Sequence, residues 1–444
     1  MKSIIRSLRH RNFRLYFFGQ GLSVTGTWMQ SVALIWLVYR LTDSKAVLGL
    51  AVFSSQILTF VVAPLAGVLA DRWNRRRALI AAQALAMAQA LGLAAVAYTM
   101  PEEKVDHWVE IWPILALSLF TGLVRGFEVP TRHSFIVQML DDRKDLPNAI
   151  ALNSLMVITA RVIGCTLAGL LIQAIGRHGE ATVLLMNGLS YSTIIVSLGM
   201  MRIVPRRREA PTEAVLAGLK QGWGYVWHKP TLRTVLLLLA LTSLVAVPHS
   251  EMLPAFAKDV HLLGGGPDTL SYLKGVAAGG ALLALVLLAY RRTAVPLGRI
   301  LVGGGVLFGL GLIAFGAATW YCRSLPVSLA VMAWVGLAMA TQMYACNTML
   351  QTTSDENKRG RVMSFYTMAF MGVAPFGAML MGWLAEVLDT RLAVWGPAYE
   401  GLGAPAVVAA GGAILTVGAL LLGRRLPKRV RAAPPTVDGI EPAG

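Results

Sequence analysis

Charged side chains lie near the middle of two long apolar runs of this sequence, where a charge is costly and therefore informative. Arg125 and Glu128 are three residues apart in one run, and Arg161 lies midway along the next. A charge at the centre of a bilayer costs about 2.5 to 3.5 kcal/mol on insertion scales, so such residues usually serve function. Two guanidinium groups and one carboxylate would attract an anionic ligand, and Glu128 could also carry a proton. An equally good interpretation is a structural ion-pair network between two helices.

A second candidate site lies in the stretch VAVPHSEMLPAF, at the end of the seventh apolar run. His249 and Glu251 stand there between Pro248 and Pro254. Histidine titrates near neutral pH and glutamate accepts protons, so the pair could form a protonation site. The alternative is a polar pair at a broken helix end near the outer mouth. Weaker candidates for lining a cavity, which could equally hydrogen-bond between helices, are Gln20, Trp28, Gln30, Gln342, Tyr344 and Asn347.

The elements that carry these residues are apolar segments of membrane-spanning length. The chain has 444 residues, of which 56% are hydrophobic and 14% charged, whereas about 25% are charged in ordinary soluble proteins. Because about 20 apolar residues cross the hydrocarbon core as a helix, the sequence predicts an all-α integral membrane protein. The expected spans are residues 15–39, 47–70, 78–98, 111–137, 149–175, 182–201, 234–255, 270–290, 297–320, 326–350, 363–384 and 404–422.

The distribution of basic residues predicts how these spans are oriented. The formal net charge is +17, which in a soluble protein would suggest nucleic acid binding. Here 29 of the 40 Lys and Arg residues fall in the tails and alternate loops on one side, and only eight, including Lys274, are assigned to the other loops. Basic residues collect in cytoplasmic loops, so both termini are expected in the cytoplasm. We therefore expect a multi-pass protein of the cell inner membrane, with the bilayer and no nucleic acid as partner.

A long polar stretch divides the chain into two sets of six spans. We expect an N-terminal six-helix bundle over 1–202, a cytoplasmic linker over 203–233, a C-terminal six-helix bundle over 234–424 and a basic, then disordered, cytoplasmic tail over 425–444. The linker segment LKQGWGYVWHKPTLR is basic and aromatic, which is typical of an amphipathic helix on a membrane surface; a partner-docking site is the alternative. Residues 151–169 resemble residues 361–379, with Cys165 opposite Pro375, as parallel halves of a transporter predict.

The stretch GVLADRWNRRR, between the second and third spans, resembles a motif of the major facilitator superfamily. That motif reads Gly-x-x-x-Asp-Arg-x-Gly-Arg-Arg/Lys. Asn74 stands where the family usually has glycine, and because Asn tolerates left-handed backbone well, the turn is expected to survive. The matching residues, for which the resemblance implies a gating role centred on the aspartate, are Gly67, Asp71, Arg72, Arg75 and Arg76.

Further stretches resemble the bacterial efflux branch that includes siderophore and macrolide exporters, among them RGFEVPTRHSFIVQML and ARVIGCTLAG. The branch usually reads Gly-Pro in the fifth span, where this chain has Gly164-Cys165; Gly164 and Gly169 still allow close helix packing. The resemblance implies two pseudo-symmetric six-helix bundles and proton-coupled export of a small organic molecule by alternating access. A lipid or lysophospholipid transporter of the same fold and a membrane sensor without flux stay open as alternatives.

Other chemistries find no support in the sequence. No GxxxxGK[ST] motif is present, so ATP-driven transport is not expected, and no Cys/His cluster has the spacing of a metal site. We therefore expect a protein that is not an enzyme and has no cofactor, with the proton gradient as energy source. We expect a small-molecule substrate and a monomer.

Overall fold

The computed structural model describes residues 6–72, 74–105, 108–140, 142–202, 223–290, 296–355, 358–396 and 399–426, without the side chains of a few helical residues, among them 63–72. Within these ranges, twelve helical segments are long and apolar enough to cross a membrane. They confirm the predicted all-α, twelve-span fold. In lipid a backbone must satisfy its own hydrogen bonds, so each apolar run folds as a helix.

The N-terminal half contains six unbroken spans, and the C-terminal half contains six of which two are interrupted. The first six are α1 (Arg11–Thr42), α2 (Lys45–Arg72), α3 (Arg75–Thr99), α4 (Trp112–Ile136), α5 (Leu146–Ile175) and α6 (Gly179–Met200). The other six are α8 (Pro230–Val245) with α9 (His249–Lys258), α10 (Pro267–Tyr290), α11 (Leu297–Ala317), α12 (Leu325–Thr353), α13 (Arg359–Thr367) with α14 (Ala374–Leu392), and α15 (Gly403–Gly423).

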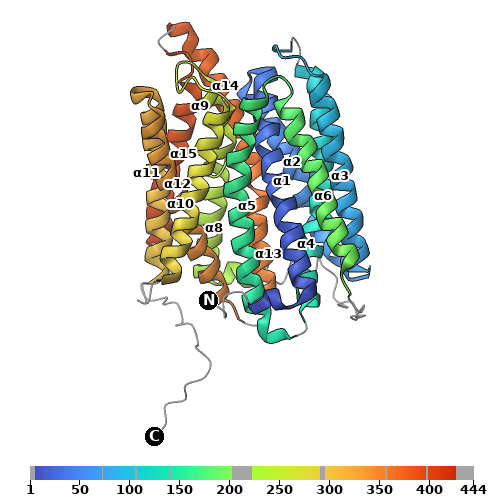
Figure 1. Cartoon of the computed structure of the whole chain (residues 1–444). Helices are drawn as coiled ribbons and strands as arrows, with labels where there is room; N and C mark the ends of the chain where they lie inside the picture. Colours follow the sequence, from blue (N-terminus) through green and yellow to red (C-terminus); the bar gives the residue numbers. More distant parts are fainter. Residues whose placement is uncertain are drawn as a thin grey trace.

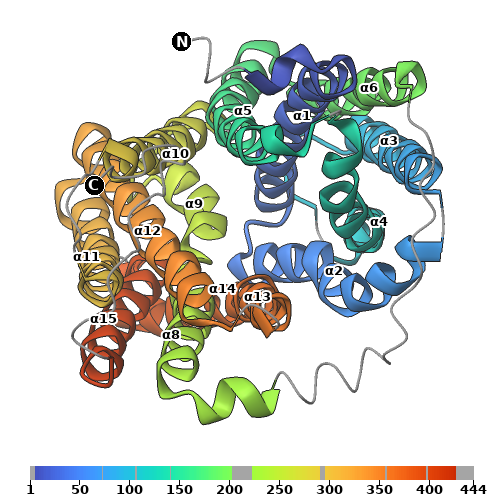
Figure 2. The ribbon, with the colours of Figure 1, turned by 90° about the horizontal axis from the view of Figure 1, so that it is seen from below.

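The helices form two groups that lie side by side, as the view along the helix axes shows (Figure 2). In the N-terminal half α1 packs on α5 and α6, and α2 packs on α4; in the C-terminal half α12 packs on α10 and α11. α1 begins and α15 ends at the same end of the bundle, the lower end in Figure 1. We call this end the terminal face and the other end the opposite face.

The two most extensive helix contacts between the halves both depend on glycine. In α2 against α14, a Cβ on Gly49 would clash with the carbonyl of Ala378. In α5 against α10, a Cβ on Gly169 would clash with the carbonyl of Pro267, and the Gly169 N–H donates to Ser271 Oγ at 2.7 Å. Small residues let backbones approach closely where lipid supplies no hydrophobic drive. The prediction that Gly164 and Gly169 permit close packing is confirmed, with Gly164 against Thr25 and Trp28 of α1.

The seventh and eleventh spans are interrupted at proline. α8 ends at Val245, where the Thr242 carbonyl accepts from the N–H groups of both Ala246 and Val247, and α9 begins after Pro248. The eleventh span passes through a π-helical turn, Met368–Gly372, just before Pro375. The ring of proline removes a donor and clashes with the preceding turn. Cys165 keeps its N–H, and α5 is continuous at the corresponding position.

Some predicted boundaries differ from the structure. α8 begins at Pro230, four residues before the expected start of the C-terminal bundle, because proline is well suited to the first helical turn. Of the expected linker, residues 223–233 are described: 223–228 are helical, and α8 begins at Pro230. Residues 203–222 and the tail beyond residue 426 lie outside the described residues. Lys274, which we assigned to a loop, lies inside α10 with its side chain only 10% exposed.

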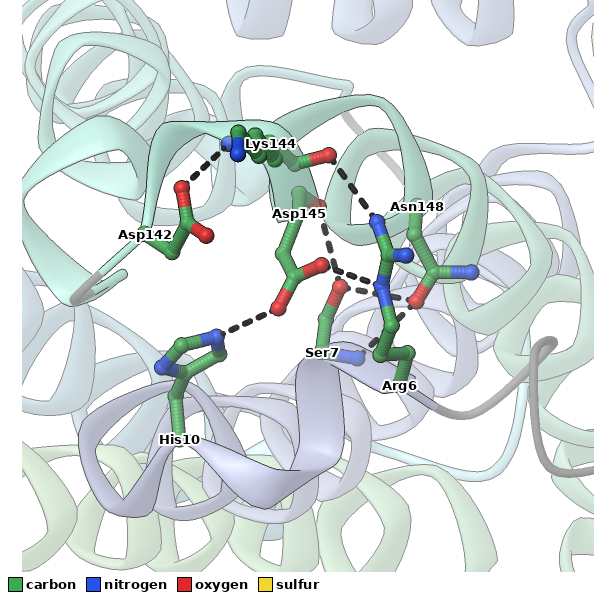
Figure 3. Close-up of polar contacts among 7 residues, drawn as sticks. All are labelled: Arg6, Ser7, His10, Asp142, Lys144, Asp145 and Asn148. Atoms are coloured by element: carbon green, nitrogen blue, oxygen red, sulfur yellow. Dashed lines mark hydrogen bonds and ion pairs between the residues drawn. The ribbon is translucent and has the colours of Figure 1, made fainter. Parts of the chain in front are cut away.

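A set of polar contacts attaches the start of the chain to the start of α5 on the terminal face (Figure 3). Arg6 forms an ion pair with Asp145, and His10 Nε2 lies 2.8 Å from the same carboxylate. Ser7, which is fully buried, donates through both its N–H and its hydroxyl to Asn148 Oδ1. The hydrogen bond from His10 and the charge of Arg6 lower the pKa of Asp145. These contacts hold α1 and α5 in a fixed relation within the N-terminal half.

Candidate transport site

A small cavity of about 70 Å³ lies between the two halves. α1, α2 and α4 line it from the N-terminal half, and α9 lines it from the C-terminal half, so it is the natural place for a ligand that both halves would hold. Its lining combines apolar side chains with amide, hydroxyl and charged groups, which is the usual composition of a ligand pocket. The polar residues that line it are Gln30, Ser31, Ser55, Gln56, Thr121, Arg125 and Glu251.

Arg125 enters the cavity from the middle of α4. Among the described residues its guanidinium has no hydrogen bond or ion pair, although the side chain is only partly exposed. Gly122 and Gly126, one on each side of it, pack against Ser55 and Val62 of α2, so the helix carrying Arg125 lies tightly on α2. The arginine is therefore held in place through its backbone, while its five N–H donors remain available to a ligand.

Glu251 enters the same cavity from α9 and is paired with a lysine. Its carboxylate lies 3.5 Å from Lys274 Nζ of α10 and accepts a hydrogen bond from Ser250 Oγ at 2.9 Å. The carboxylate is 23% exposed and the lysine 10%, so both charges are largely removed from solvent. Because Glu251 shares a cavity with Arg125, it lies deeper than the outer mouth at which the sequence placed it.

Arg161 brings a third positive charge to this region from α5. Its guanidinium lies 4.9 Å from the centre of the Trp28 ring, a favourable cation–π geometry. Arg125 and Lys274 are the cations beside the Glu251 carboxylate, and Arg161 lies over Trp28 of α1. The acid that the structure brings to Arg125 is therefore Glu251 and not Glu128.

Glu128 is directed away from the cavity. Its carboxylate lies 3.3 Å from Arg132 Nε, one turn further along α4, and accepts from Gln83 Nε2 of α3 at 3.3 Å. The sequence analysis placed Glu128 beside Arg125, which is position i−3 relative to it. Arg132 is position i+4, and on a helix surface both positions are neighbours of Glu128. Within the described residues Glu128 is thus part of a contact between α3 and α4, and the expected network between α4 and α5 is not formed.

His249 also leaves the site. It is buried, its Nδ1 lies 2.7 Å from the Ala246 carbonyl, and its ring packs edge-on against Phe308 of α11, with the ring centres 5.7 Å apart. Two residues of helix turn a side chain by about 200°, so His249 faces the core of the C-terminal half while Glu251 faces the cavity. The structure does not bring the two together.

Of the six residues expected either to line a cavity or to hydrogen-bond between helices, some do the first and some the second. Gln30 lines the cavity and is fixed by Gln89 of α3 and Asn187 of α6, at 3.3 and 2.6 Å. Trp28 lies beneath Arg161. Gln342 donates to Thr242 of α8 at 2.8 Å and is fully buried, so it connects helices of one half. The remaining three do not line this cavity: Gln20 is buried in α1, Asn347 accepts from Gln351, and Tyr344 is 37% exposed.

Ion pairs join the halves at the opposite face. Lys45, at the start of α2, forms an ion pair with Asp389 of α14, and its N–H donates to Glu386 at 2.7 Å. Lys258, at the end of α9, donates to Asp43 at 3.0 Å. The Gly169 N–H that donates to Ser271 adds a polar link between the halves on the α5–α10 contact. The two halves are therefore joined by charged groups at the opposite face.

The stretch GVLADRWNRRR between α2 and α3 is only partly described. The side chains of Gly67, Asp71 and Arg72 lie outside the described residues, so the gating role of Asp71 stays a prediction. Arg75 is the first residue of α3. The guanidinium of Arg76 donates to two carbonyl groups at the end of α6, from Nε to Leu198 at 2.7 Å and from a terminal nitrogen to Gly199. A guanidinium there satisfies carbonyl groups that a helix end leaves free.

Asn74 corrects one expectation about this motif. Its φ is −66°, so the position is not left-handed. Its side-chain oxygen instead accepts from the N–H groups of Arg76 and Arg77, at 3.1 and 3.3 Å, which makes it the N-cap of α3. Asparagine is accommodated here because it caps a helix.

The sequence analysis did not identify Lys274 or the polar residues of α2 that line the cavity as candidate site residues. Lys274 lies four residues inside the apolar run that begins at residue 270, so a charge within a span was there to be recognised. Ser55 and Gln56 of α2 gave no comparable signal, since isolated polar residues in a span are common as contacts between helices.

Comparison with known proteins agrees with this architecture. The family model described as "Transmembrane secretion effector" matches residues 2–423. The chain is 23% identical over 382 residues to the multidrug efflux pump Tap of Mycobacterium tuberculosis, covering 84% of this chain and 86% of that protein. It is 26% identical over 430 residues to the enterobactin exporter EntS of Shigella boydii, covering 96% and 95%.

A solved structure with the same fold is a bacterial homologue of the human lysosomal transporter Spinster in an inward-facing, unoccupied conformation. The TM-score is 0.70 at 15% identity, and the match covers 93% of this chain and 98% of that one. The likeness to that structure concerns the fold alone. The family match covers nearly the whole chain, and the relatives are matched over most of their length. The chain therefore belongs to the transmembrane secretion effectors, a family of major facilitator transporters.

Proposed function

We propose that this transporter exports a small amphipathic organic molecule in exchange for protons, with both termini in the cytoplasm. The names of the relatives, a multidrug efflux pump and an enterobactin exporter, support export. The excess of basic residues in the loops of the terminal face supports the orientation. With that orientation, the ion pairs of the opposite face join the two halves on the outer side.

The observation that carries the proposal is the shared cavity of Arg125 and Glu251. One belongs to each half, so a ligand touching both would report the relative position of the halves. Ligand binding shifts an equilibrium only through differential contacts with the two states. A site made by residues of both halves supplies such contacts, because rocking of the halves changes the distance between them.

The charges suggest how a proton and a substrate exclude each other. Ionised Glu251 can accept a hydrogen bond from a substrate hydroxyl or amine, while Arg125 binds an acceptor or anionic group of the same molecule. A proton on Glu251 removes that acceptor and also frees Lys274 from its ion pair. The substrate then loses one of its two anchoring contacts. Export coupled to proton entry follows if protonation occurs on the outside and deprotonation on the inside.

Proteoliposomes test this proposal. Enterobactin, a lipophilic fluorescent dye and a lysophospholipid are offered separately, with and without a pH gradient, and uptake is followed together with an internal pH dye. We expect flux of the first or second compound that rises with the gradient. Flux of the lysophospholipid alone would favour a lipid transporter, and absence of flux for every compound in folded protein would favour a sensor.

Two variants locate the coupling. Glu251→Gln should lose the effect of the gradient, since it imitates the protonated form and can no longer exchange a proton. Exchange of labelled for unlabelled substrate should continue at a raised KM, since Arg125 still binds the substrate while the second contact is lost. Arg125→Ala should raise KM, since it removes a substrate contact. Gradient-driven transport by both variants at the wild-type rate would refute the assignment of this cavity.

A further inference from the structure

A second and larger cavity, of about 500 Å³, lies on the terminal face of the C-terminal half. It lies between the short helix over residues 223–228 and the first turn of α13, far from the cavity of Arg125. A volume of this size suits a small organic group. Four of the residues that line it have basic side chains, namely His228, Lys229, Lys358 and Arg361. The other two lining residues are Gly224 and Tyr225.

The ring of Tyr225 holds two of these cations in place. The ammonium groups of Lys229 and Lys358 each lie 4.6 Å from the ring centre, and Lys229 also donates to the Tyr225 hydroxyl at 2.7 Å. The cation–π attraction offsets part of the repulsion between two like charges on one small surface. Two flexible lysines are thereby ordered before any ligand arrives.

The carboxylate of Asp355 acts against this positive charge. It lies 2.9 Å from Lys229 Nζ, and its side chain is 59% exposed. Lys358 has no carboxylate partner among the described residues, and Glu356, next to Asp355 in the sequence, lies outside them. The ammonium of Lys358 is therefore suited to a phosphate or another anion.

The position of the cavity coincides with the surface of the membrane. Three spans have an end beside it: α8 begins at Pro230, α12 ends at Thr353 and α13 begins at Arg359. The short helix before α8 lies at the outer rim of the bundle (Figure 2). It carries Trp223 and Trp227, whose rings are stacked 5.2 Å apart and are 54% and 46% exposed. Exposed tryptophans at this depth are typical of the headgroup region of a bilayer.

We propose that this cavity binds the headgroup phosphate of an anionic phospholipid such as phosphatidylglycerol. Lys358 contacts the phosphate, with Lys229 and Arg361 beside it, and the exposed parts of Trp223 and Trp227 contact the glycerol and the first acyl carbons. The Trp227 ring also carries the guanidinium of Arg233, 5.5 Å from its centre. A free phosphate ion would use the charges but leave the exposed parts of the indoles in water. Basic pockets between membrane helices are suited to anionic headgroups for the same reason.

Native mass spectrometry and lipid titration test the proposal on the full chain. The protein is placed in phosphatidylcholine nanodiscs with increasing phosphatidylglycerol, and retained lipid is counted after ejection. A basic residue in contact with the anionic headgroup is expected to change affinity about fivefold, so Lys358→Gln with Arg361→Gln should weaken retention about 30-fold. The matched control is Arg424→Gln with Arg425→Gln, two exposed basic residues at the end of α15 on the same face. It should retain phosphatidylglycerol like the wild type.

Other outcomes would overturn the proposal. Equal retention by the wild type and the Lys358/Arg361 variant excludes this cavity, and an equal loss in the α15 control reduces the effect to general surface charge. Inorganic phosphate that displaces phosphatidylglycerol at comparable concentration would identify a soluble anion as the ligand instead. If the double variant does not fold, Lys358→Gln alone is measured, with an expected fivefold loss, and the pair Lys358→Arg with Arg361→Lys must restore retention.

Discussion

Replacing Lys45 by glutamine should shift the transporter toward a conformation open at the opposite face. Lys45 forms an ion pair with Asp389 across the two halves, and its ammonium is 8% exposed while the carboxylate is 21% exposed. The variant removes this ion pair and keeps the backbone hydrogen bond from residue 45 to Glu386. When the halves separate at this face both charged groups regain water, so the loss applies to one state only.

The size of the shift follows from the burial of the pair. A hydrogen bond between charged groups contributes about 1.5 to 3 kcal/mol net, and the low exposure of both groups limits screening by solvent. Taking about 2 kcal/mol, the ratio of closed to open conformations at the opposite face should fall about 30-fold, since each 1.4 kcal/mol is a factor of ten.

Electron spin distance measurements can follow this ratio. Spin labels on Glu103→Cys and Val394→Cys place one exposed reporter on each half at the opposite face. Cys322 is exposed and must first be replaced by serine, whereas Cys165 and Cys346 are buried. The long-distance population should grow in the Lys45→Gln variant.

Arg40 supplies a matched control. Its Nε lies 2.7 Å from Glu180 at the same face, but both residues belong to the N-terminal half. Arg40→Gln should therefore lower the thermal stability without changing the distance distribution. A distribution that Lys45→Gln leaves unchanged, or that Arg40→Gln changes as much, would refute the reasoning.

Three further expectations concern the site, the helix packing and the first contacts of the chain. Glu128→Gln should retain most gradient-driven transport, whereas Glu251→Gln loses it; the reverse order would return the proton site to α4. Gly169→Ala should reduce the transport rate at least tenfold, because its Cβ meets a backbone carbonyl of α10, while Gly199→Ala, which meets no atom within 4 Å, should transport normally. The pKa of Asp145 is lower in the folded protein than in the unfolded chain, so ionised Asp145 stabilises the fold above its unfolded pKa of about 4, and this contribution is lost as pH falls through the folded pKa. The Tm of the wild type should therefore fall at acid pH more steeply than the Tm of Asp145→Asn. Equal slopes would exclude a stabilising role for this contact.

The architecture was predictable because its signals are local. Runs of apolar residues of bilayer length define the spans, and a single long polar stretch divides them into two sets of six. The charged stretch around Asn74 also indicated the position of the connection between the second and third spans. The role of Asn74 was not predictable in detail, because both a left-handed turn and an N-cap favour asparagine and only the backbone angles distinguish them.

The candidate site was predictable only in part, because its contacts are not local. Arg125 and Glu251 are 126 positions apart in the chain, and no periodicity brings them to one cavity. The pairing of Glu128 depended on the choice between positions i−3 and i+4 of the same helix, which have similar separations. Lys274 was missed for a simpler reason: it stands near the end of a span, where a charge is easily assigned to the loop.

The interruption between α8 and α9 makes α9 a separate short helix that touches both halves. It has ten residues and contacts α1 and α2 of the N-terminal half as well as α10, α14 and α15, and three residues with their own hydrogen bonds separate it from α8. Glu251 of the cavity and Lys258 of the opposite face both lie on it. If Glu251 carries the proton, as proposed, a change of its charge and the contact between Lys258 and Asp43 are connected through about two turns of one helix. The cavity and the ion pairs of the opposite face can then respond together.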